Sequence, residues 1–206
     1  MDRPQVSGAQ PEADAERAGR VQALTARLDV DRTIALVGMP GAGKTTMGRR
    51  LAKALGFEFR DADEEIQAAA GGLTVAEIFA ERGEAEFRRM ERSVIARLLK
   101  ANPPHILATG GGAFMNAETR ALMAESAVTI WLRAEFDVLL ARVKRKGRAR
   151  PLLDGDPAGK LAQLLAERQP VYALADIVVD SRAAPPAQTV ESMLTALGAH
   201  FGQASA

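Results

Sequence analysis

Short apolar runs alternate along the chain with segments whose apolar residues recur at helical spacing. The runs lie at residues 33–37, 57–59, 106–108, 128–132 and 177–179, and their length and flanks predict buried β-strands. Strands that alternate with helices are typical of a parallel sheet with helices on both faces. The hydrophobic pattern therefore predicts an α/β fold.

Several of the intervening helices have recognisable ends. Thr74 is predicted to cap a short helix that contains Ile78, and Gly83 is predicted to break it. A longer helix then starts at Glu84 and ends near residues 102–104, with an apolar stripe formed by Phe87, Met90, Val94 and Leu98. Arg88 lies about 100° round from Phe87, at the edge of this stripe, so it can border a cleft.

Further helices are predicted later in the chain. Asn116 is the predicted cap of one, and residues 138–143 mark the next. A helix that includes residues 161–165 is predicted to end at residues 168–170, where Pro170 stands. Apolar positions within residues 190–197 predict the terminal helix. Residues 1–30 are predicted to be an extension, either flexible or partly a short helix, before a domain spanning residues 31–202.

The segment Gly38-Met39-Pro40-Gly41-Ala42-Gly43-Lys44-Thr45 fits the phosphate-binding pattern G-x-x-x-x-G-K-[ST]. It follows the first predicted strand and precedes a predicted helix, which is the context the pattern requires. Successive N–H groups can form an anion nest at the positive end of the helix. Lys44 can reach the β- and γ-phosphates of a nucleotide, and the Thr45 hydroxyl can bind Mg²⁺.

Polar residues and glycines follow two other predicted strands. Asp61 and Asp63 end the second strand, and Gly110-Gly111-Gly112 follow the third. Ligands of open parallel sheets bind beside the carboxyl ends of the strands, so a ligand site is predicted there. Taken alone, the aspartates could equally be helix caps, and the glycines could form a mobile loop.

A basic run, residues 142–150, precedes a Gly/Pro-punctuated segment, residues 151–157. Such a run is usually a solvated surface. In a protein that handles phosphate it also fits a closing lid, here placed at about residues 144–157.

Composition narrows the function classes. The chain has 206 residues, a net charge of +1, no cysteine and two histidines, His105 and His200. We therefore expect no nucleic-acid or membrane partner, no thiolate metal site and no two-histidine metal site. Both histidines are expected to be solvated or at strand edges. The N-terminus lacks the apolar core of a signal peptide, so a cytoplasmic location is expected.

Separated motifs together resemble the shikimate kinase family over about residues 32–200. They are the phosphate loop with Thr46 and Gly48; Asp61-x-Asp63; Ile78-Phe79; Gly83-Glu84; Phe87-Arg88-Arg89-x-Glu91; Gly110 to Ala113; Arg150-Pro151-Leu152-Leu153; and Arg168-x-Pro-x-Tyr172. The resemblance implies a P-loop NTPase fold of the nucleoside-monophosphate-kinase type, with three α/β/α layers, a five-stranded parallel sheet and a lid. It implies an enzyme that transfers the γ-phosphoryl group of ATP to the 3-hydroxyl of shikimate in aromatic amino-acid biosynthesis.

The resemblance also implies roles for individual residues. ATP would be bound by Gly41, Ala42, Gly43, Lys44, Thr45, Thr46, Arg150 and Pro186, and Mg²⁺ by Thr45 and Asp61. Shikimate would be bound by Asp63, Arg88, Gly110, Gly111, Gly112 and Arg168. Lys44, Asp63 and Arg150 would be catalytic. Arginine forks suit the shikimate carboxylate. We expect ATP and shikimate as partners, Mg²⁺ as cofactor and a monomer.

The sequence departs from the family pattern in the predicted adenine pocket. Some members have an arginine two residues before the adenine-contacting proline, where this chain has Ala184, with Arg182 offset.

The sequence leaves two alternative functions open. One is a related small-molecule kinase, such as a gluconate kinase, and the other is a kinase-like regulatory domain.

Overall fold

The computed structural model describes residue 19 and residues 30–101, 104–146 and 156–204. Apart from residues 19 and 30, the predicted N-terminal extension lies outside the described residues. So do residues 147–155 of the predicted lid, including Arg150.

The described residues form one five-stranded sheet in which every pairing is parallel. The strands are β1 (Thr33–Val37), β2 (Glu58–Asp61), β3 (His105–Ala108), β4 (Ala127–Arg133) and β5 (Ile177–Asp180), in the spatial order β2-β3-β1-β4-β5. β1 is central and fully buried, because both of its faces carry helices. The predicted α/β fold with a five-stranded parallel sheet is thereby confirmed.

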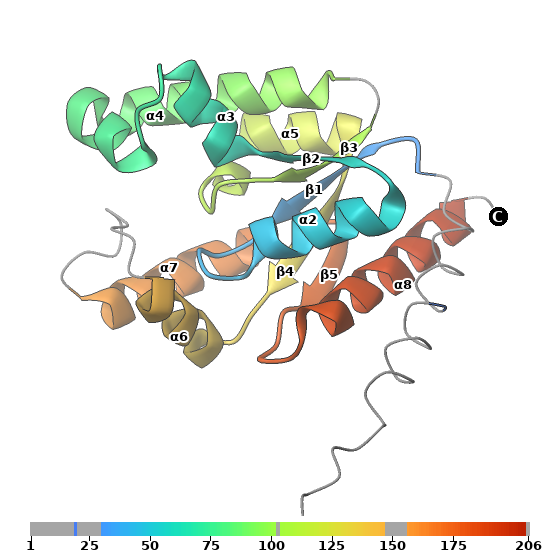
Figure 1. Cartoon of the computed structure of the whole chain (residues 1–206). Coiled ribbons are helices and arrows are strands. Elements are labelled where there is room, and N and C mark those ends of the chain that lie inside the picture. The colour runs from blue at the N-terminus through green and yellow to red at the C-terminus, as the bar shows by residue number, and fades with distance from the viewer. Residues whose placement is uncertain (1–18, 20–29, 102–103, 147–155, 205–206) are drawn as a thin grey trace, which may run out of the picture.

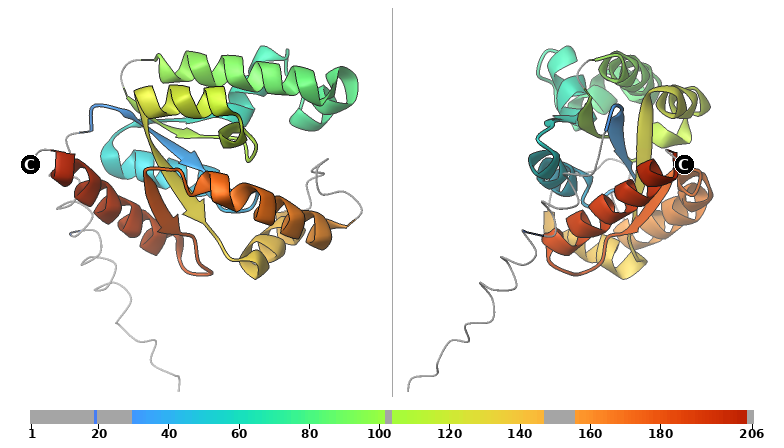
Figure 2. Two further views of the ribbon diagram at one scale, coloured as in Figure 1. Left: turned by 180° about the vertical axis from the view of Figure 1, so that it is seen from behind. Right: turned by 90° about the vertical axis from the view of Figure 1, so that its right-hand side faces the viewer.

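Helices cover the sheet on both faces. They are α2 (Lys44–Leu55), α3 (Ala62–Ala69), α4 (Val75–Leu99), α5 (Ala117–Ser126), α6 (Phe136–Lys146), α7 (Pro157–Tyr172) and α8 (Pro186–Ala204), with a 3₁₀ turn at Ala113–Met115. α2 and α8 pack together on one face, whereas α5 and α7 lie on the other (Figures 1 and 2). The carboxyl ends of β1, β2 and β3 lie at the left of Figure 1, between α3 and α4 on one side and α6 and α7 on the other.

Local sequence signals fall where they were predicted. The Thr74 hydroxyl accepts from the Glu77 N–H at 3.2 Å, and the Glu77 carboxylate accepts from the Thr74 N–H, so the two residues form a capping box. Asn116 caps α5 by accepting from the Thr119 N–H at 2.9 Å. At Gly83 the backbone leaves the helical region (φ 79°, ψ 167°), which breaks α4 as predicted.

Two details differ from the sequence predictions. α7 continues through Pro170 to Tyr172, because Tyr172 is buried against the sheet and the Ala173 N–H bonds the Gln169 carbonyl at 3.0 Å. His105 lies at the start of β3, but it is buried and not solvated, with its Nδ1 3.3 Å from the Thr33 hydroxyl. Within the described part of the chain, no helix is long and apolar enough to cross a membrane.

Candidate active site

The phosphate loop connects the carboxyl end of β1 to the start of α2. Gly43 caps α2 with a left-handed φ of 99°, which a residue with a side chain rarely adopts. The ammonium of Lys44 folds back over the loop and donates to the carbonyls of Gly38 at 2.7 Å and Met39 at 3.0 Å. The loop thus places one positive charge at the positive end of a helix, which is an arrangement that favours a phosphate anion.

Arg142 and Ser181 support this loop from distant parts of the chain, and neither was predicted from the sequence. The Ser181 hydroxyl is fully buried and donates to the Ala42 carbonyl at 2.7 Å. The Arg142 guanidinium, at the start of the basic run, donates to Ser181 at 2.9 Å and lies within 3.4 Å of the Gly41 and Ala42 carbonyls. Burial and the neighbouring Arg145 lower the pKa of Arg142 below its usual value. An anion bound nearby would therefore favour its charge.

Thr45 and Asp61 meet beside the phosphate loop. The Thr45 hydroxyl donates to Asp61 Oδ2 at 2.8 Å, and Asp61 Oδ1 accepts the backbone N–H of Asp63 at 3.0 Å. Asp61 therefore caps α3, which is one of the two interpretations of this carboxylate; its binding of Mg²⁺ stays a prediction. No group of three or more His, Cys, Asp or Glu residues that could hold a metal is found among the described residues. Hydroxyl and carboxylate oxygens still suit Mg²⁺, which commonly takes its remaining ligands from phosphates and water.

The three glycines after β3 make room for side chains of the site. A Cβ on Gly110 would lie 2.6 Å from Glu91 Oε1 and 3.1 Å from Asp63 Oδ1, and one on Gly112 would collide with the Arg88 guanidinium. A Cβ on Gly111 would lie 2.9 Å from the ring of Pro40 in the phosphate loop. Thr109, which precedes this glycine turn (residues 110–112), is hydrogen-bonded to β1. Its N–H and its hydroxyl both donate to the Leu36 carbonyl. The turn is thus packed between α4 and the phosphate loop.

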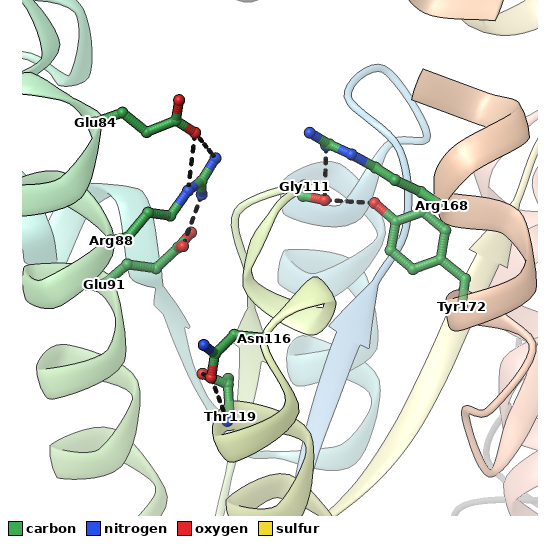
Figure 3. Close-up of polar contacts among 8 residues, drawn as sticks. All are labelled: Glu84, Arg88, Glu91, Gly111, Asn116, Thr119, Arg168 and Tyr172. Atoms are coloured by element: carbon green, nitrogen blue, oxygen red, sulfur yellow. Dashed lines mark hydrogen bonds and ion pairs between the residues drawn. The ribbon is translucent and has the colours of Figure 1, made fainter. Parts of the chain in front are cut away.

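Arg88 is held by two glutamates on the same helix. Its Nη1 donates to Glu91 Oε2 at 2.8 Å, and its Nη2 donates to Glu84 Oε1 at 3.1 Å (Figure 3). Glu91 is only 3% exposed, and its Oε1 has no hydrogen-bond partner among the described residues. Glu91 belonged to a recognised motif but received no role from the sequence. Helical spacing could have found this contact, because residues three apart on a helix, such as Arg88 and Glu91, share a face.

Burial raises the pKa of Glu91 above its usual value, although the ion pair with Arg88 opposes this; Asp63 raises it further. The folded chain therefore holds this proton more tightly than the unfolded chain. It follows that the stability contributed at Glu91 is lost as the pH rises from the ordinary glutamate range through the raised folded pKa.

We therefore expect Glu91→Gln to flatten the dependence of stability on pH. The glutamine cannot ionise, so the variant should not lose stability over the pH window above about 4.3 in which buried Glu91 deprotonates. The measurement is the free energy of unfolding in urea at closely spaced pH values for both proteins. Equal slopes of stability against pH in the two proteins would contradict the raised pKa.

Arg168 and Tyr172 approach the glycine turn from α7. Arg168 Nη1 donates to the Gly111 carbonyl at 2.9 Å, and the Tyr172 hydroxyl donates to the same oxygen. Figure 3 shows Arg88 and Arg168 extending from opposite sides toward this turn. Arg168 is 8% exposed. A buried guanidinium presents several N–H donors in one plane, which suits a bound carboxylate or phosphate.

The structure thus brings Lys44, Thr45, Asp61, Asp63, Arg88, the glycine turn and Arg168 to one edge of the sheet. Thr46 is exposed on α2, and Pro186 is half-buried at the first position of α8. Arg150 lies outside the described residues.

Comparisons with known proteins agree with the motifs. A family model described as shikimate kinase matches residues 40–198. The chain belongs to the shikimate kinase family. This confirms the family, and with it the kinase class, that the sequence motifs predicted. The gluconate-kinase and regulatory alternatives are not favoured.

Relatives of this family cover most of the chain. The shikimate kinase of Caulobacter vibrioides (strain NA1000 / CB15N) is 55% identical over 167 residues, which are 81% of this chain and 82% of that protein. The shikimate kinase of Rhodopseudomonas palustris is 49% identical over 195 residues, 94% of each chain. A solved shikimate kinase from Acinetobacter baumannii, in complex with shikimate, superposes with a TM-score of 0.77 at 35% identity, covering 83% of this chain and 95% of that one. A gluconokinase from Sinorhizobium meliloti 1021, with a TM-score of 0.58 at 20% identity, shares the fold alone.

Proposed function

We propose that this chain transfers the γ-phosphoryl group of ATP to the 3-hydroxyl of shikimate, giving 3-phosphoshikimate and ADP. The observation that carries the proposal is the arrangement of Arg88 and Arg168 on opposite sides of the glycine turn, directly beside the phosphate loop. A carboxylate bound between two guanidinium groups would be fixed next to the nucleotide. Shikimate carries such a carboxylate together with three hydroxyl groups.

The nucleotide would be held by the phosphate loop. Backbone N–H groups from Gly41 to Thr46 would surround the phosphates, and Lys44 would move from the carbonyls it now contacts to the β- and γ-phosphates. Thr45 and Asp61 are the residues suited to hold Mg²⁺, directly or through water. The ion would neutralise developing charge on the phosphate oxygens. Arg150 is proposed to reach the transferred phosphoryl group, and Pro186 to lie against adenine.

The acceptor would be oriented by the groups around the glycine turn. Arg88 and Arg168 would bind the carboxylate, while Asp63 would accept hydrogen bonds from the ring hydroxyls and take the reacting proton. Glu91 offers a further contact for the acceptor. Its Oε1 atom is buried beside Gly110 and has no hydrogen-bond partner among the described residues. A substrate hydroxyl could donate to it and remove the cost of that unsatisfied oxygen. Phosphoryl transfer then depends mainly on positioning and charge, which these residues supply.

An ADP-release assay tests the proposed acceptor. With ATP and Mg²⁺ present, shikimate should produce ADP at a rate far above the no-acceptor background, and gluconate should not. Gluconate also carries a carboxylate and hydroxyl groups, so it is a demanding control for charge alone. Turnover of gluconate without turnover of shikimate would contradict the proposal.

A cytoplasmic location and a monomeric state stay predictions.

A further inference from the structure

Tyr172 is the last residue of α7 and contacts the glycine turn. It is the one tyrosine of the chain and is 1% exposed. Its hydroxyl donates to the Gly111 carbonyl, the same oxygen that accepts from Arg168 Nη1 at 2.9 Å. Since residues four apart lie on one helical face, α7 presents both donors to this single carbonyl (Figure 3).

The tyrosine ring has little freedom to move. It stacks on Trp131 of β4 with a centroid distance of 5.9 Å and an interplanar angle of 29°. Trp131 in turn lies against the backbone at Gly38, where the phosphate loop starts. Burial raises the pKa of Tyr172 to about 12, so the hydroxyl remains a donor across the physiological range.

The geometry of the peptide bond transmits this anchoring to the other side of the turn. In a trans peptide, the carbonyl of one residue and the N–H of the next point in opposite directions. Because the Gly111 carbonyl is held toward Arg168 and Tyr172 of α7, the Gly112 N–H is directed away from α7. The Arg88 guanidinium lies against Gly112. Rotation of this peptide would move the N–H and would also release Arg168 Nη1.

We propose that Tyr172 is a positioning residue for the acceptor site. With Arg168 it fixes the Gly111–Gly112 peptide, so that the Arg168 guanidinium and the Gly112 N–H both face the bound acceptor. Tyr172 does not touch the acceptor itself. This inference rests on the proposed function, because it assumes that the acceptor lies between Arg88 and Arg168.

The substitution Tyr172→Phe removes the hydroxyl and keeps the stacked ring. We expect the KM for shikimate to rise about three- to tenfold, the effect of one lost neutral hydrogen bond. The KM for ATP should stay within about twofold, since the phosphate loop holds the nucleotide separately. Calorimetric titration of shikimate into each protein without ATP, so that no turnover occurs, should show the Kd for shikimate rising by the same factor.

A matched control is Thr129→Val, which also removes a buried hydroxyl from the sheet region. The Thr129 hydroxyl donates to Asp176 at 2.7 Å, and Asp176 keeps the Thr129 N–H as a partner in the variant. This variant should lose stability without changing either KM. A parallel rise of both KM values in Tyr172→Phe would mean a general structural role and would overturn the proposal.

A double-mutant cycle with Arg168→Lys provides the sharper test. Two residues that act through one carbonyl should be coupled, so the double variant should lose less shikimate affinity than the product of the single losses. Independent effects, or an unchanged shikimate KM in Tyr172→Phe, would overturn the inference while leaving the proposed function standing. Failure of the proposed function is distinct, because the wild type itself would then release no ADP with shikimate.

Discussion

Lys44→Ala is expected to lower kcat by roughly 10²- to 10³-fold while the fold is retained. The side chain supplies the positive charge at the start of α2, and loss of one preorganised electrostatic contact to a transition state has an effect of about this size. Its ammonium donates to the carbonyls of Gly38 and Met39 within the phosphate loop itself, so loss of these contacts should leave the sheet and helices in place. The measurements are steady-state kinetics with saturating shikimate and the circular dichroism spectrum of the variant.

The control for Lys44→Ala is Lys53→Ala. Lys53 is an exposed residue in the last turn of the same helix, so this variant makes the same change of charge away from the phosphate loop. We expect its kcat to match the wild type. Near-normal kcat in a folded Lys44→Ala protein would contradict the assignment of the phosphate loop.

Arg88→Ala is expected to raise the KM for shikimate at least tenfold and to leave the KM for ATP nearly unchanged. Removal of one partner of a hydrogen-bonded charge pair costs roughly 2–5 kcal/mol, and each 1.4 kcal/mol is a factor of ten in affinity. The substitution also removes the cation that pairs with buried Glu91. Without this cation the pKa of the buried Glu91 would rise further, because the Arg88 ion pair opposes the effect of burial.

Arg89→Ala is the matched control, because Arg89 is the next residue, is exposed and pairs only with Glu86 among the described residues. This variant should keep the wild-type KM for shikimate. Arg88→Lys should recover part of the lost affinity, since an ammonium restores the charge but cannot form a bidentate fork. If Arg89→Ala and Arg88→Ala raise the KM for shikimate equally, the effect is not specific to the site.

A shikimate analogue with a neutral carboxamide separates charge from shape. The wild type should use this amide poorly, because both arginines would face a neutral group. In the Arg88→Ala variant, the difference between the rates at which the acid and the amide are phosphorylated should become smaller. If the wild type phosphorylates the amide as well as the acid, Arg88 and Arg168 do not recognise a carboxylate, and the case for shikimate loses its main chemical support.

Much of the local structure could be predicted because it depends on short-range rules. The phosphate loop needs a strand before it and a helix after it, and both were visible as apolar patterns. Thr74 with Glu77, and Asn116 with Thr119, satisfy the N–H groups at helix starts within one turn. Gly83 breaks α4 because its backbone adopts a positive φ. These features require no knowledge of the rest of the chain.

The surroundings of the site residues could not be predicted in the same way. Arg142 was part of a basic run that could have been a solvated surface, yet it contacts loop carbonyls 100 and 101 residues away. Ser181 carries no local signal, but its hydroxyl reaches Ala42 across 139 residues. A helix end was expected at Pro170, but packing of Tyr172 on Trp131 extends α7 past it.

The sequence by itself determined the strands, the phosphate loop and the family, because periodicity, turn chemistry and motif spacing are properties of neighbouring residues. Only the tertiary structure decided which side chains share an environment. The order β2-β3-β1-β4-β5 places Asp61, the glycine turn and Lys44 at adjacent strand ends. Burial then makes Glu91 a carboxylate with a raised pKa beside Arg88, and Gly111 the shared acceptor of Arg168 and Tyr172. Both outcomes depend on desolvation and on contacts between distant segments, which the order of residues along the chain does not specify locally.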